Sequence, residues 1–287
     1  MKINLIKPYG FCSGVQNAID LVMAARKENP DACLVLLYPL VHNENVTNYL
    51  KQQNISVADL KDKSVEEFLK EISEDSIVIF PAHGHNQKWQ KILEERKIKY
   101  FDTICPLIKE NIFKIKQSLA QNKKIVFVGD EKHLETQSIL SINNQIQLFE
   151  DVNSIPENST MCFQTTCDTN KAKLVIESCS KKQNIEIINT LCPVVENRLN
   201  QIESLESEGL AVVIGDKTSA NANSLYKAAI EKFGSDKTLF INSLEDLKKE
   251  EVFLLSSDAL NIVSATSTPT SLVDDIYNYL LNLNNDW

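Results

Sequence analysis

The sequence has few of the features that mark the commonest nucleotide-binding and membrane proteins. Only seven of its 287 residues are glycine, and neither G-x-G-x-x-G nor G-x-x-x-x-G-K-[ST] occurs, so the usual glycine-rich phosphate loops are absent. No apolar run approaches the ~20 residues that a membrane-spanning helix needs. The opening residues MKINLIKPYGFC lack the basic start and apolar stretch of a secretion signal. We therefore expect a cytoplasmic protein that makes no membrane contact.

The sequence also has few positive charges for an anion-binding protein. Its formal net charge is −9 and only three of its residues are arginine, which argues against a basic surface for nucleic acid. An anion would have to be bound by imidazoles, hydroxyls, amides, lysines or helix N-termini. The seven cysteines are expected to be thiols or metal ligands rather than disulfides, because a cytoplasmic compartment is reducing.

The most informative feature is an internal repeat. Asp102–Leu107 reads DTICPL and Asn189–Val194 reads NTLCPV, and each segment follows a short β-like run and precedes a helical pattern. A proline directly after the cysteine suits the first position of a helix. A fainter third copy, YGFCSGV, surrounds Cys12. The copies predict three similar α/β units with the approximate bounds 1–103, 104–190 and 191–287.

Each unit contains further junctions at which an apolar strand gives way to a polar loop, among them VHNEN, PAHGHNQ, QTTCDTN and SATSTPTS. Strands that alternate with helices predict an α/β fold with mainly parallel sheets. Such sheets bind ligands outside the carboxyl ends of their strands. We expect the three units to be arranged with pseudo-threefold symmetry around a central cavity into which these loops project.

Cys12, Cys105 and Cys192 occupy equivalent positions of the three copies. A thiolate at a helix N-terminus is stabilised by the helix dipole, and three converging thiolates need a cationic centre such as an iron–sulfur cluster. Three thiolates on a four-iron cluster would leave one iron open to a substrate oxygen. The cysteines within apolar patterns are predicted to be small buried hydrophobes: Cys33, Cys162 and Cys179.

The polar loops contain candidate binding residues. Three histidines each follow the end of a predicted strand: His42, His83 and His133. One loop histidine is usually solvated, but three at related junctions suit phosphate binding. Ser219 and Asn221 in GDKTSANANS, like Ser267 in SATSTPT, fit either a helix cap or an anion site. Glu135 is either a partner of a helix dipole or a proton donor in a dry cavity, and its spacing does not decide between them.

Together these residues resemble the 4-hydroxy-3-methylbut-2-enyl diphosphate reductases, which catalyse the last step of the non-mevalonate (MEP) isoprenoid pathway. The resemblance covers roughly residues 3 to 280 and depends on segments in the same order and with similar spacing: KPYGFCSGV, LVHNENV, PAHGHNQ, DTICPL, KHLETQS, QTT, LCPVVENR and TSANANSL. The GFC-x-GV opening together with the two T-x-CP segments is the specific part, since one polar loop alone would be a weak signal.

The resemblance implies an iron–sulfur oxidoreductase whose 4Fe–4S cluster is held by Cys12, Cys105 and Cys192. Such enzymes reductively remove the allylic hydroxyl of their diphosphate substrate, with the substrate oxygen at the open iron, and give isopentenyl and dimethylallyl diphosphate. Their electrons come from a ferredoxin- or flavodoxin-type donor. The resemblance therefore predicts a small-molecule allylic diphosphate as the substrate.

The resemblance also assigns roles within the polar loops. It favours Glu135 as the proton donor, and it places Thr165 beside the substrate hydroxyl and His133 against the substrate. The residues expected to bind the diphosphate are His42, His83, Ser219, Asn221 and Ser267. Three residues stand where the family usually has a second serine, a proline and a glycine: Ala220, Leu134 and Ala265. We expect the missing serine to remove one contact with the phosphate.

Two other interpretations are weighed against the reductase. A zinc-stabilised binding protein could use the three cysteines and a histidine as a tetrahedral site. Structural zinc ligands usually come in close pairs, however, and here each cysteine stands alone in its unit. An iron–sulfur protein that only relays electrons would leave the histidine- and serine-rich loops without a role. The sequence favours the reductase.

Overall fold

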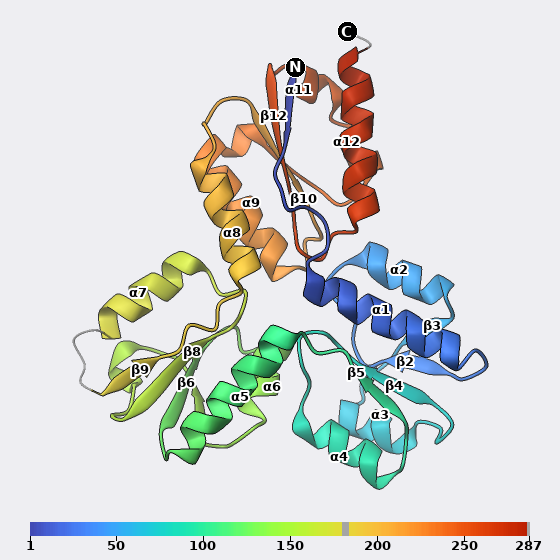
Figure 1. The fold of residues 1–287 in the computed structure, drawn as a ribbon, viewed down its shortest axis with the longest axis vertical. Helices are drawn as coiled ribbons and strands as arrows, with labels where there is room; N and C mark the ends of the chain where they lie inside the picture. The colour runs from blue at the N-terminus through green and yellow to red at the C-terminus, as the bar shows by residue number, and fades with distance from the viewer. Residues whose placement is uncertain (180–183, 286–287) are drawn as a thin grey trace. The chain divides into compact units, whose positions relative to one another are not determined.

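Three four-stranded parallel sheets form the framework of the protein (Figure 1). The computed structural model describes residues 1–179 and 184–285. The chain divides into two compact units, of which the first comprises residues 1–16, 42–47 and 193–287 and the second residues 17–41 and 48–192. The first unit contains one sheet and the second contains two.

The sheet of the first unit has the strand order β1-β12-β10-β11. Its strands are β1 (Lys2–Leu5), β10 (Leu210–Ile214), β11 (Thr238–Ile241) and β12 (Ala259–Ser264). Helices α8 and α9 lie on one face of this sheet and α12 on the other (Figure 1). The helices are α8 (Pro193–Ser204), α9 (Ala220–Phe233), the 3-10 turn η2 (Ser235–Lys237), α10 (Leu244–Lys248), α11 (Glu251–Leu255) and α12 (Thr270–Asn285).

The sheets of the second unit have the orders β3-β2-β4-β5 and β7-β6-β8-β9. The strands are β2 (Leu34–Leu36), β3 (Ile55–Val57), β4 (Ile77–Phe80), β5 (Tyr100–Asp102), β6 (Lys124–Val128), β7 (Ile146–Leu148), β8 (Ser159–Phe163) and β9 (Ile185–Ile187). Two helices start in the first unit and continue in the second, α1 (Ser13–Glu28) and α2 (Glu44–Gln52). The others are α3 (Val65–Glu71), α4 (Gln87–Glu95), α5 (Pro106–Ala120), α6 (Leu134–Leu140), η1 (Val152–Ser154) and α7 (Thr169–Cys179).

The central strands are apolar on both faces, as parallel strands between two helical layers must be. β4 reads IVIF and β10 reads LAVVI, and every residue of both strands is buried. In the first unit, Val273, Ile276 and Leu280 of α12 pack against the sheet and are fully buried. Burying one such side chain contributes about 1.5–3 kcal/mol, so these contacts hold the helices on the sheets.

All three sheets have the same topology. Apart from the edge strand β1, the next strand along the chain pairs on one side of the first strand, and the strand after it pairs on the other side: β2 lies between β3 and β4, β6 between β7 and β8, and β10 between β11 and β12. The carboxyl ends of the two central strands therefore flank a topological switch point, which is where parallel α/β sheets bind ligands. The predicted polar loops follow these central strands.

The structure confirms three α/β units with parallel sheets, and it adds one feature that the repeat did not indicate. The sequence placed residues 1–103 in one unit, whereas β1 pairs with β12. The first strand of the chain thus completes the sheet that the C-terminal segment forms. The cysteine repeat identified helices and strands, but a short edge strand such as KINL carries no signal of its partner. The three sets of bounds stay predictions.

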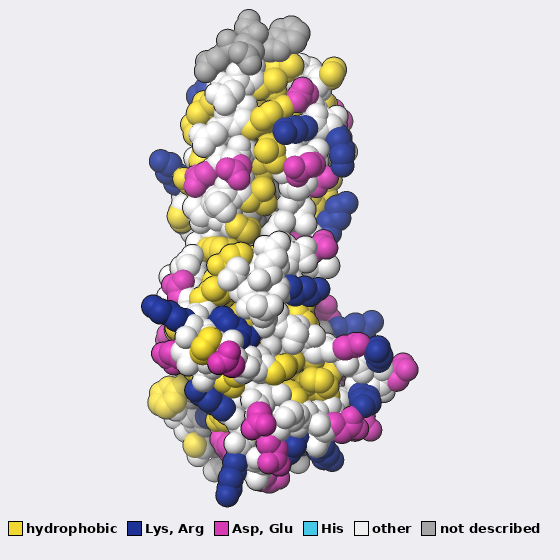
Figure 2. Space-filling view, turned by 90° about the vertical axis from the view of Figure 1, so that its right-hand side faces the viewer, with side chains coloured by type: hydrophobic (Ala, Val, Ile, Leu, Met, Phe, Trp, Pro, Cys, Tyr) yellow, Lys and Arg dark blue, Asp and Glu magenta, His cyan; other side chains and the backbone are white. Residues whose placement is uncertain are grey.

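Basic and acidic side chains are interspersed on the face of the protein shown in Figure 2. Interspersed charges give that face no strong field of one sign. Within residues 1–179 and 184–285, no helix combines the length and the apolar character that crossing a membrane requires.

The two T-x-CP segments share one hydrogen bond, which is made in both sheets of the second unit. The Thr103 hydroxyl donates to the Phe80 carbonyl at the end of β4 (2.6 Å), and the Thr190 hydroxyl donates to the Phe163 carbonyl at the end of β8 (2.6 Å). The Thr190 oxygen also accepts from the Phe163 amide (2.7 Å). The threonine side chains thus continue the pairing of neighbouring strands beyond their last residues, and they fix the start of the segment that leads to each cysteine.

Replacing Thr190 by valine should lower the free energy of unfolding by about 1–3 kcal/mol, because valine keeps the shape but leaves the buried Phe163 amide without an acceptor. Thr103→Val is the matched control and should be less destabilising, since it removes only a donor to a carbonyl. Urea unfolding of both variants measures the difference. Equal losses in the two variants would show that the amide finds another acceptor.

Candidate active site

The three repeat cysteines share one backbone hydrogen bond. In each case the cysteine amide donates to the carbonyl two residues beyond the end of the neighbouring strand, which is β12, β4 or β8. The pairs are Cys12 with Thr266 (3.1 Å), Cys105 with Ala82 (3.0 Å) and Cys192 with Thr165 (2.9 Å). The residue after each cysteine is the first residue of a helix, α1, α5 or α8. The three cysteines therefore have equivalent backbone positions.

The surroundings of these cysteines suit thiolate chemistry. Cys105 is the N-cap residue of α5, and the Val15 amide in the first turn of α1 donates to the Cys12 sulfur (3.4 Å). All three side chains are partly exposed. Because a helix N-terminus stabilises a thiolate, three such sulfurs are a donor set that fits an iron–sulfur cluster.

The convergence of the three sulfurs stays a prediction. Cys12 belongs to the first compact unit, whereas Cys105 and Cys192 belong to the second. Within the described part of the chain, no group of three His, Cys, Asp or Glu side chains is placed to hold a metal ion. The fit to a cluster rests on the chemistry and the equivalent positions of the donors.

The other cysteines differ from one another in burial. Cys162 and Cys179 are buried, as predicted, and burial raises the pKa of the Cys162 thiol to about 12, so this thiol is unreactive near neutral pH. Cys33 is exposed, and the prediction that it is buried is wrong. Cys33 lies one residue before β2, outside the apolar strand to which its sequence pattern assigned it.

Glu135 and Thr165 form a buried pair in the second unit. Glu135 lies in the first turn of α6 and is 2% exposed. Thr165 donates to the carboxylate twice, from its amide to Oε1 (2.8 Å) and from its hydroxyl to Oε2 (2.6 Å). Burial raises the pKa of Glu135 to about 7, although both hydrogen bonds act in the opposite direction. Near neutral pH this group therefore exists as acid and as carboxylate, which suits a proton donor.

His133 is the N-cap of the helix that carries Glu135. Its Nδ1 accepts a hydrogen bond from the Glu135 amide (3.2 Å), so the neutral ring carries its proton on Nε2. The rings of His83 and His133 lie edge to face, with centroids 5.3 Å apart and planes at 74°. The second unit thus brings together His83, His133, Glu135 and Thr165.

Three predicted anion-binding residues lie in the first unit, at the carboxyl ends of β10 and β12. Ser219 is the N-cap of α9, and its hydroxyl accepts from the Ala222 amide (3.3 Å). Asn221 donates from Nδ2 to the Thr266 hydroxyl (2.8 Å). The Ser267 hydroxyl is buried and has no hydrogen-bond partner among the residues that the structure describes. Buried hydroxyls are usually bonded, so Ser267 is a donor available to a polar ligand.

His42 has a charged neighbour that the sequence did not single out. Burial lowers the pKa of His42, and the negative charge of Asp216 partly offsets this effect. His42 is therefore mostly neutral near pH 7. The sequence signal that could have identified Asp216 is an acidic residue directly after the glycine that ends an apolar strand, in LAVVIGD.

Arg198 of α8 is a second residue that sequence reasoning missed. It is 1% exposed and donates to the Ser264 carbonyl (2.5 Å) and the Gly10 carbonyl (2.8 Å). The guanidinium thus joins the segment before Cys12 to the end of β12, three residues before Ser267. LCPVVENR contains this arginine, but a helical pattern gives no reason to place a cation in the core.

The chain is similar to proteins of one family along almost its whole length. The matching family model is described as LytB protein and covers residues 3–281. The chain is 32% identical to the 4-hydroxy-3-methylbut-2-enyl diphosphate reductase of Malacoplasma penetrans, over 98% of this chain and 97% of that protein. It is 30% identical to the protein of the same name from Aliivibrio fischeri, over 96% of this chain and 88% of that protein.

Solved structures show the same fold. The TM-score is 0.84 against the E-1-hydroxy-2-methyl-but-2-enyl-4-diphosphate reductase from Plasmodium falciparum, at 24% identity over 97% of this chain and 87% of that chain. It is 0.71 against a structure of (E)-4-hydroxy-3-methyl-but-2-enyl diphosphate reductase, at 22% identity over 98% of this chain and 100% of that chain. At these identities the likeness is one of fold.

Replacing Glu135 by glutamine should stabilise the protein above neutral pH. The pKa of Glu135 rises from 4.5 to about 7 on folding, so the folded state disfavours the ionised form. This penalty is absent at a pH well below 4.5, grows as the pH rises and is complete above about 7. It amounts to roughly 3 kcal/mol. Glutamine can keep both contacts, because the Thr165 hydroxyl can accept from the amide group.

Urea unfolding of the wild type and of Glu135→Gln at several pH values measures this effect. The stability difference between the two proteins should be several times larger at alkaline pH than at acidic pH. Glu131→Gln, at an exposed position four residues earlier, should show no such trend. A difference that does not change with pH would contradict the raised pKa.

Proposed function

The chain belongs to the LytB protein family, and on this premise we propose that it is a 4-hydroxy-3-methylbut-2-enyl diphosphate reductase. The reaction takes up two electrons and two protons. The allylic C–O bond breaks, the oxygen leaves as water and one proton is added to the carbon skeleton, which gives isopentenyl and dimethylallyl diphosphate. This is the last step of the non-mevalonate isoprenoid pathway. The observation that carries the proposal is the buried pair of Glu135 and Thr165, an acid with a pKa near neutrality.

Glu135 is the proposed proton donor. Its Oε1 accepts from the Thr165 amide (2.8 Å), so the proton of the acid form lies on Oε2, next to the Thr165 hydroxyl (2.6 Å). In this form Glu135 donates to the Thr165 oxygen, and the Thr165 hydroxyl can donate in turn to the substrate oxygen. His133 offers a further donor from Nε2. Glu135, Thr165 and His133 can thus supply protons without a permanently charged side chain among them.

The diphosphate is proposed to lie at the N-terminus of α9. Ser219, Asn221 and Ser267 are the proposed donors there, and the end of a helix stabilises negative charge. His42 and His83 are proposed to donate as well. Hydroxyl, amide and imidazole donors can thus serve an anion-binding protein that has only three arginines.

Cys12, Cys105 and Cys192 are the proposed ligands of a 4Fe–4S cluster. Their positions next to helix N-termini favour the thiolate form that iron requires. When bound, the cluster supplies the two electrons of the reaction, one at a time. We propose that a ferredoxin- or flavodoxin-type protein delivers these electrons and that the enzyme works in the cytoplasm.

Anaerobic turnover tests the proposal. Protein purified without oxygen should be brown, contain about four irons per chain and convert 4-hydroxy-3-methylbut-2-enyl diphosphate to the two products with a chemical reductant. Glu135→Gln should keep the iron and the colour and lose nearly all turnover. Colourless protein that contains zinc would support the zinc-stabilised binding protein, and a brown protein without turnover would support electron relay.

Replacing Ser267 by alanine should separate binding from folding. The free energy of unfolding should be unchanged or rise by about 1 kcal/mol, because the variant removes a buried hydroxyl that has no partner in the described structure. The KM should rise ~10- to 100-fold, since a hydrogen bond to a charged group is lost.

Ser224→Ala is the matched control for this variant. The Ser224 hydroxyl lies in α9, also in the first unit, and donates to the Ala220 carbonyl (3.1 Å), so its removal should leave the KM unchanged. Steady-state kinetics and urea unfolding measure the two effects. A Ser267→Ala protein that is less stable and has a normal KM would assign the hydroxyl to folding.

A further inference from the structure

We propose that Asp216 is a positioning residue of the diphosphate site. Its carboxylate fastens the loop between β10 and α9 (residues 215–219), which ends at Ser219, to the segment that contains His42 (His42–Thr47). This inference rests on the proposed function and names a residue that acts on the substrate through others.

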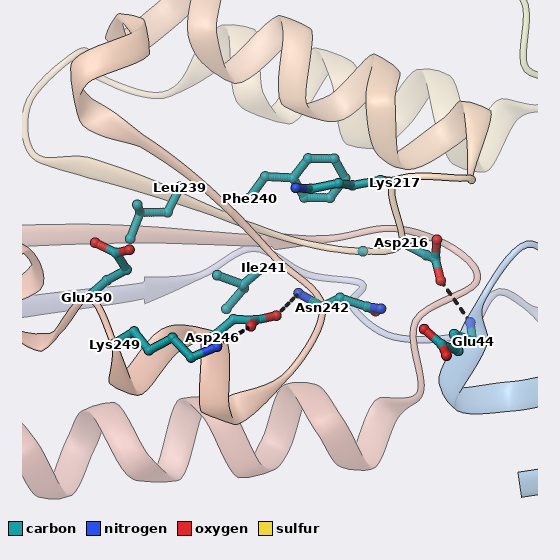
Figure 3. Close-up of a pocket in the computed structure, with 11 residues that line it drawn as sticks. Glu44, Asp216, Lys217, Leu239, Phe240, Ile241, Asn242, Asp246, Lys249 and Glu250 are labelled. Atoms are coloured by element: carbon teal, nitrogen blue, oxygen red, sulfur yellow. Dashed lines mark hydrogen bonds and ion pairs between the residues drawn. The ribbon is translucent and has the colours of Figure 1, made fainter. Parts of the chain in front are cut away.

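Each oxygen of the Asp216 carboxylate serves one of the two segments. Oδ2 accepts from the Glu44 amide (2.8 Å), and Oδ1 accepts from the amide (2.9 Å) and the hydroxyl (2.7 Å) of Thr218. Asp216 is 6% exposed, and its carboxylate points at the start of α2 (Figure 3). One side chain therefore sets the distance between two segments that each carry proposed diphosphate donors.

The bond to Glu44 also completes the N-terminus of α2. Glu44 is the first residue of this helix, so its amide is one of those that the helix itself cannot satisfy. The Asn43 side chain accepts from the Val46 amide (3.3 Å), and Asp216 supplies the acceptor for Glu44. A carboxylate at this position is favoured by the helix dipole. The backbone next to His42 is thus fixed from both sides.

The charge of Asp216 has two opposite effects on an anion. Burial raises the pKa of Asp216, but its hydrogen bonds with Thr218 and Glu44 and the charge of His42 outweigh this effect, so the pKa lies below its usual value and the side chain is ionised near neutral pH. The charge repels a diphosphate directly, yet it favours the cationic form of His42. Asp216 lines a cavity beside β11 (Figure 3). The other charged residues that line this cavity are Glu44, Lys217, Asp246, Lys249 and Glu250.

Asp216→Asn distinguishes a positioning role from simple charge repulsion, because the two roles predict opposite changes in diphosphate binding. The asparagine has one carbonyl oxygen and cannot accept from both segments. A positioning role predicts that the KM of the holoenzyme and the inhibition constant of inorganic diphosphate rise about tenfold, while kcat changes by less than about threefold. If Asp216 were only a repelling charge, the same variant would bind diphosphate more tightly. That result, or an unchanged inhibition constant, overturns the proposal.

Glu250→Gln is the matched control. It removes the same charge from the opposite end of the same cavity (Figure 3), so it reports the effect of charge alone, and diphosphate binding should be unchanged or slightly tighter. An equal loss of binding in both variants would overturn the proposal.

The dependence on pH provides a readout that a purely structural role would not change. Removing Asp216 lowers the pKa of His42 further, so the variant gains a cationic His42 only at a lower pH than the wild type. The ratio of the two inhibition constants, variant over wild type, should therefore grow as the pH falls from about 8 to about 6. The titration of diphosphate itself cancels in this ratio, and a ratio that is constant with pH contradicts the coupling to His42.

Asp216→Glu keeps the charge but displaces both oxygens by one methylene. Should Asp216→Asn fail to fold, this variant decides alone: a raised inhibition constant supports positioning, and an unchanged one overturns it. Failure of the proposed function has a different signature, because the wild type would then neither turn over the substrate nor bind diphosphate. If only the inference fails, the wild type is active and the Asp216 variant has the same inhibition constant for diphosphate as the wild type.

Discussion

The hydrogen bond from each cysteine amide to the carbonyl beyond the neighbouring strand is the constraint on which the candidate site depends. It is made in all three sheets, to Ala82, Thr165 and Thr266. In each sheet the accepting residue or the next one is a proposed substrate residue: His83 follows Ala82, Thr165 accepts the bond itself and Ser267 follows Thr266. One backbone hydrogen bond therefore fixes the position of a proposed cluster ligand relative to a proposed substrate residue in each sheet.

Burial sets the charge state of the site. It raises the pKa of Glu135 to about 7 and lowers the pKa of His42, so both groups are shifted towards their neutral forms. Asp216 is the contrast, because three hydrogen bonds keep it ionised. A site made of neutral donors binds an anion through placed hydrogen bonds rather than through net charge. Such a site is consistent with a chain of net charge −9, and it makes the exact placement of loops more important than the number of cations.

The fold and the equivalence of the cysteines could be predicted because both leave local signals in the sequence. Strands such as β4 and β10 are buried on both faces and appear as unbroken apolar runs, and the T-x-CP segments repeat. Other features depend on contacts between distant residues and leave no local pattern. The partner of β1, the bonds of Asp216 to Glu44 and those of Arg198 to Gly10 and Ser264 join segments far apart in the chain. Cys33 was misassigned because the pattern located β2 one residue too early.

The pairing of β1 with β12 explains why the cysteines come where they do in the chain. Each follows an edge strand, β1, β5 or β9, and precedes the helix with which the chain leaves that sheet. Cys105 lies between β5 and α5, which packs on β6 of the next sheet, and Cys192 lies between β9 and α8, which packs along α9. β1 pairs with β12, and Cys12, which follows β1, donates to Thr266, which follows β12. β1 is therefore to its sheet what β5 and β9 are to the other two: the edge strand that precedes a repeat cysteine.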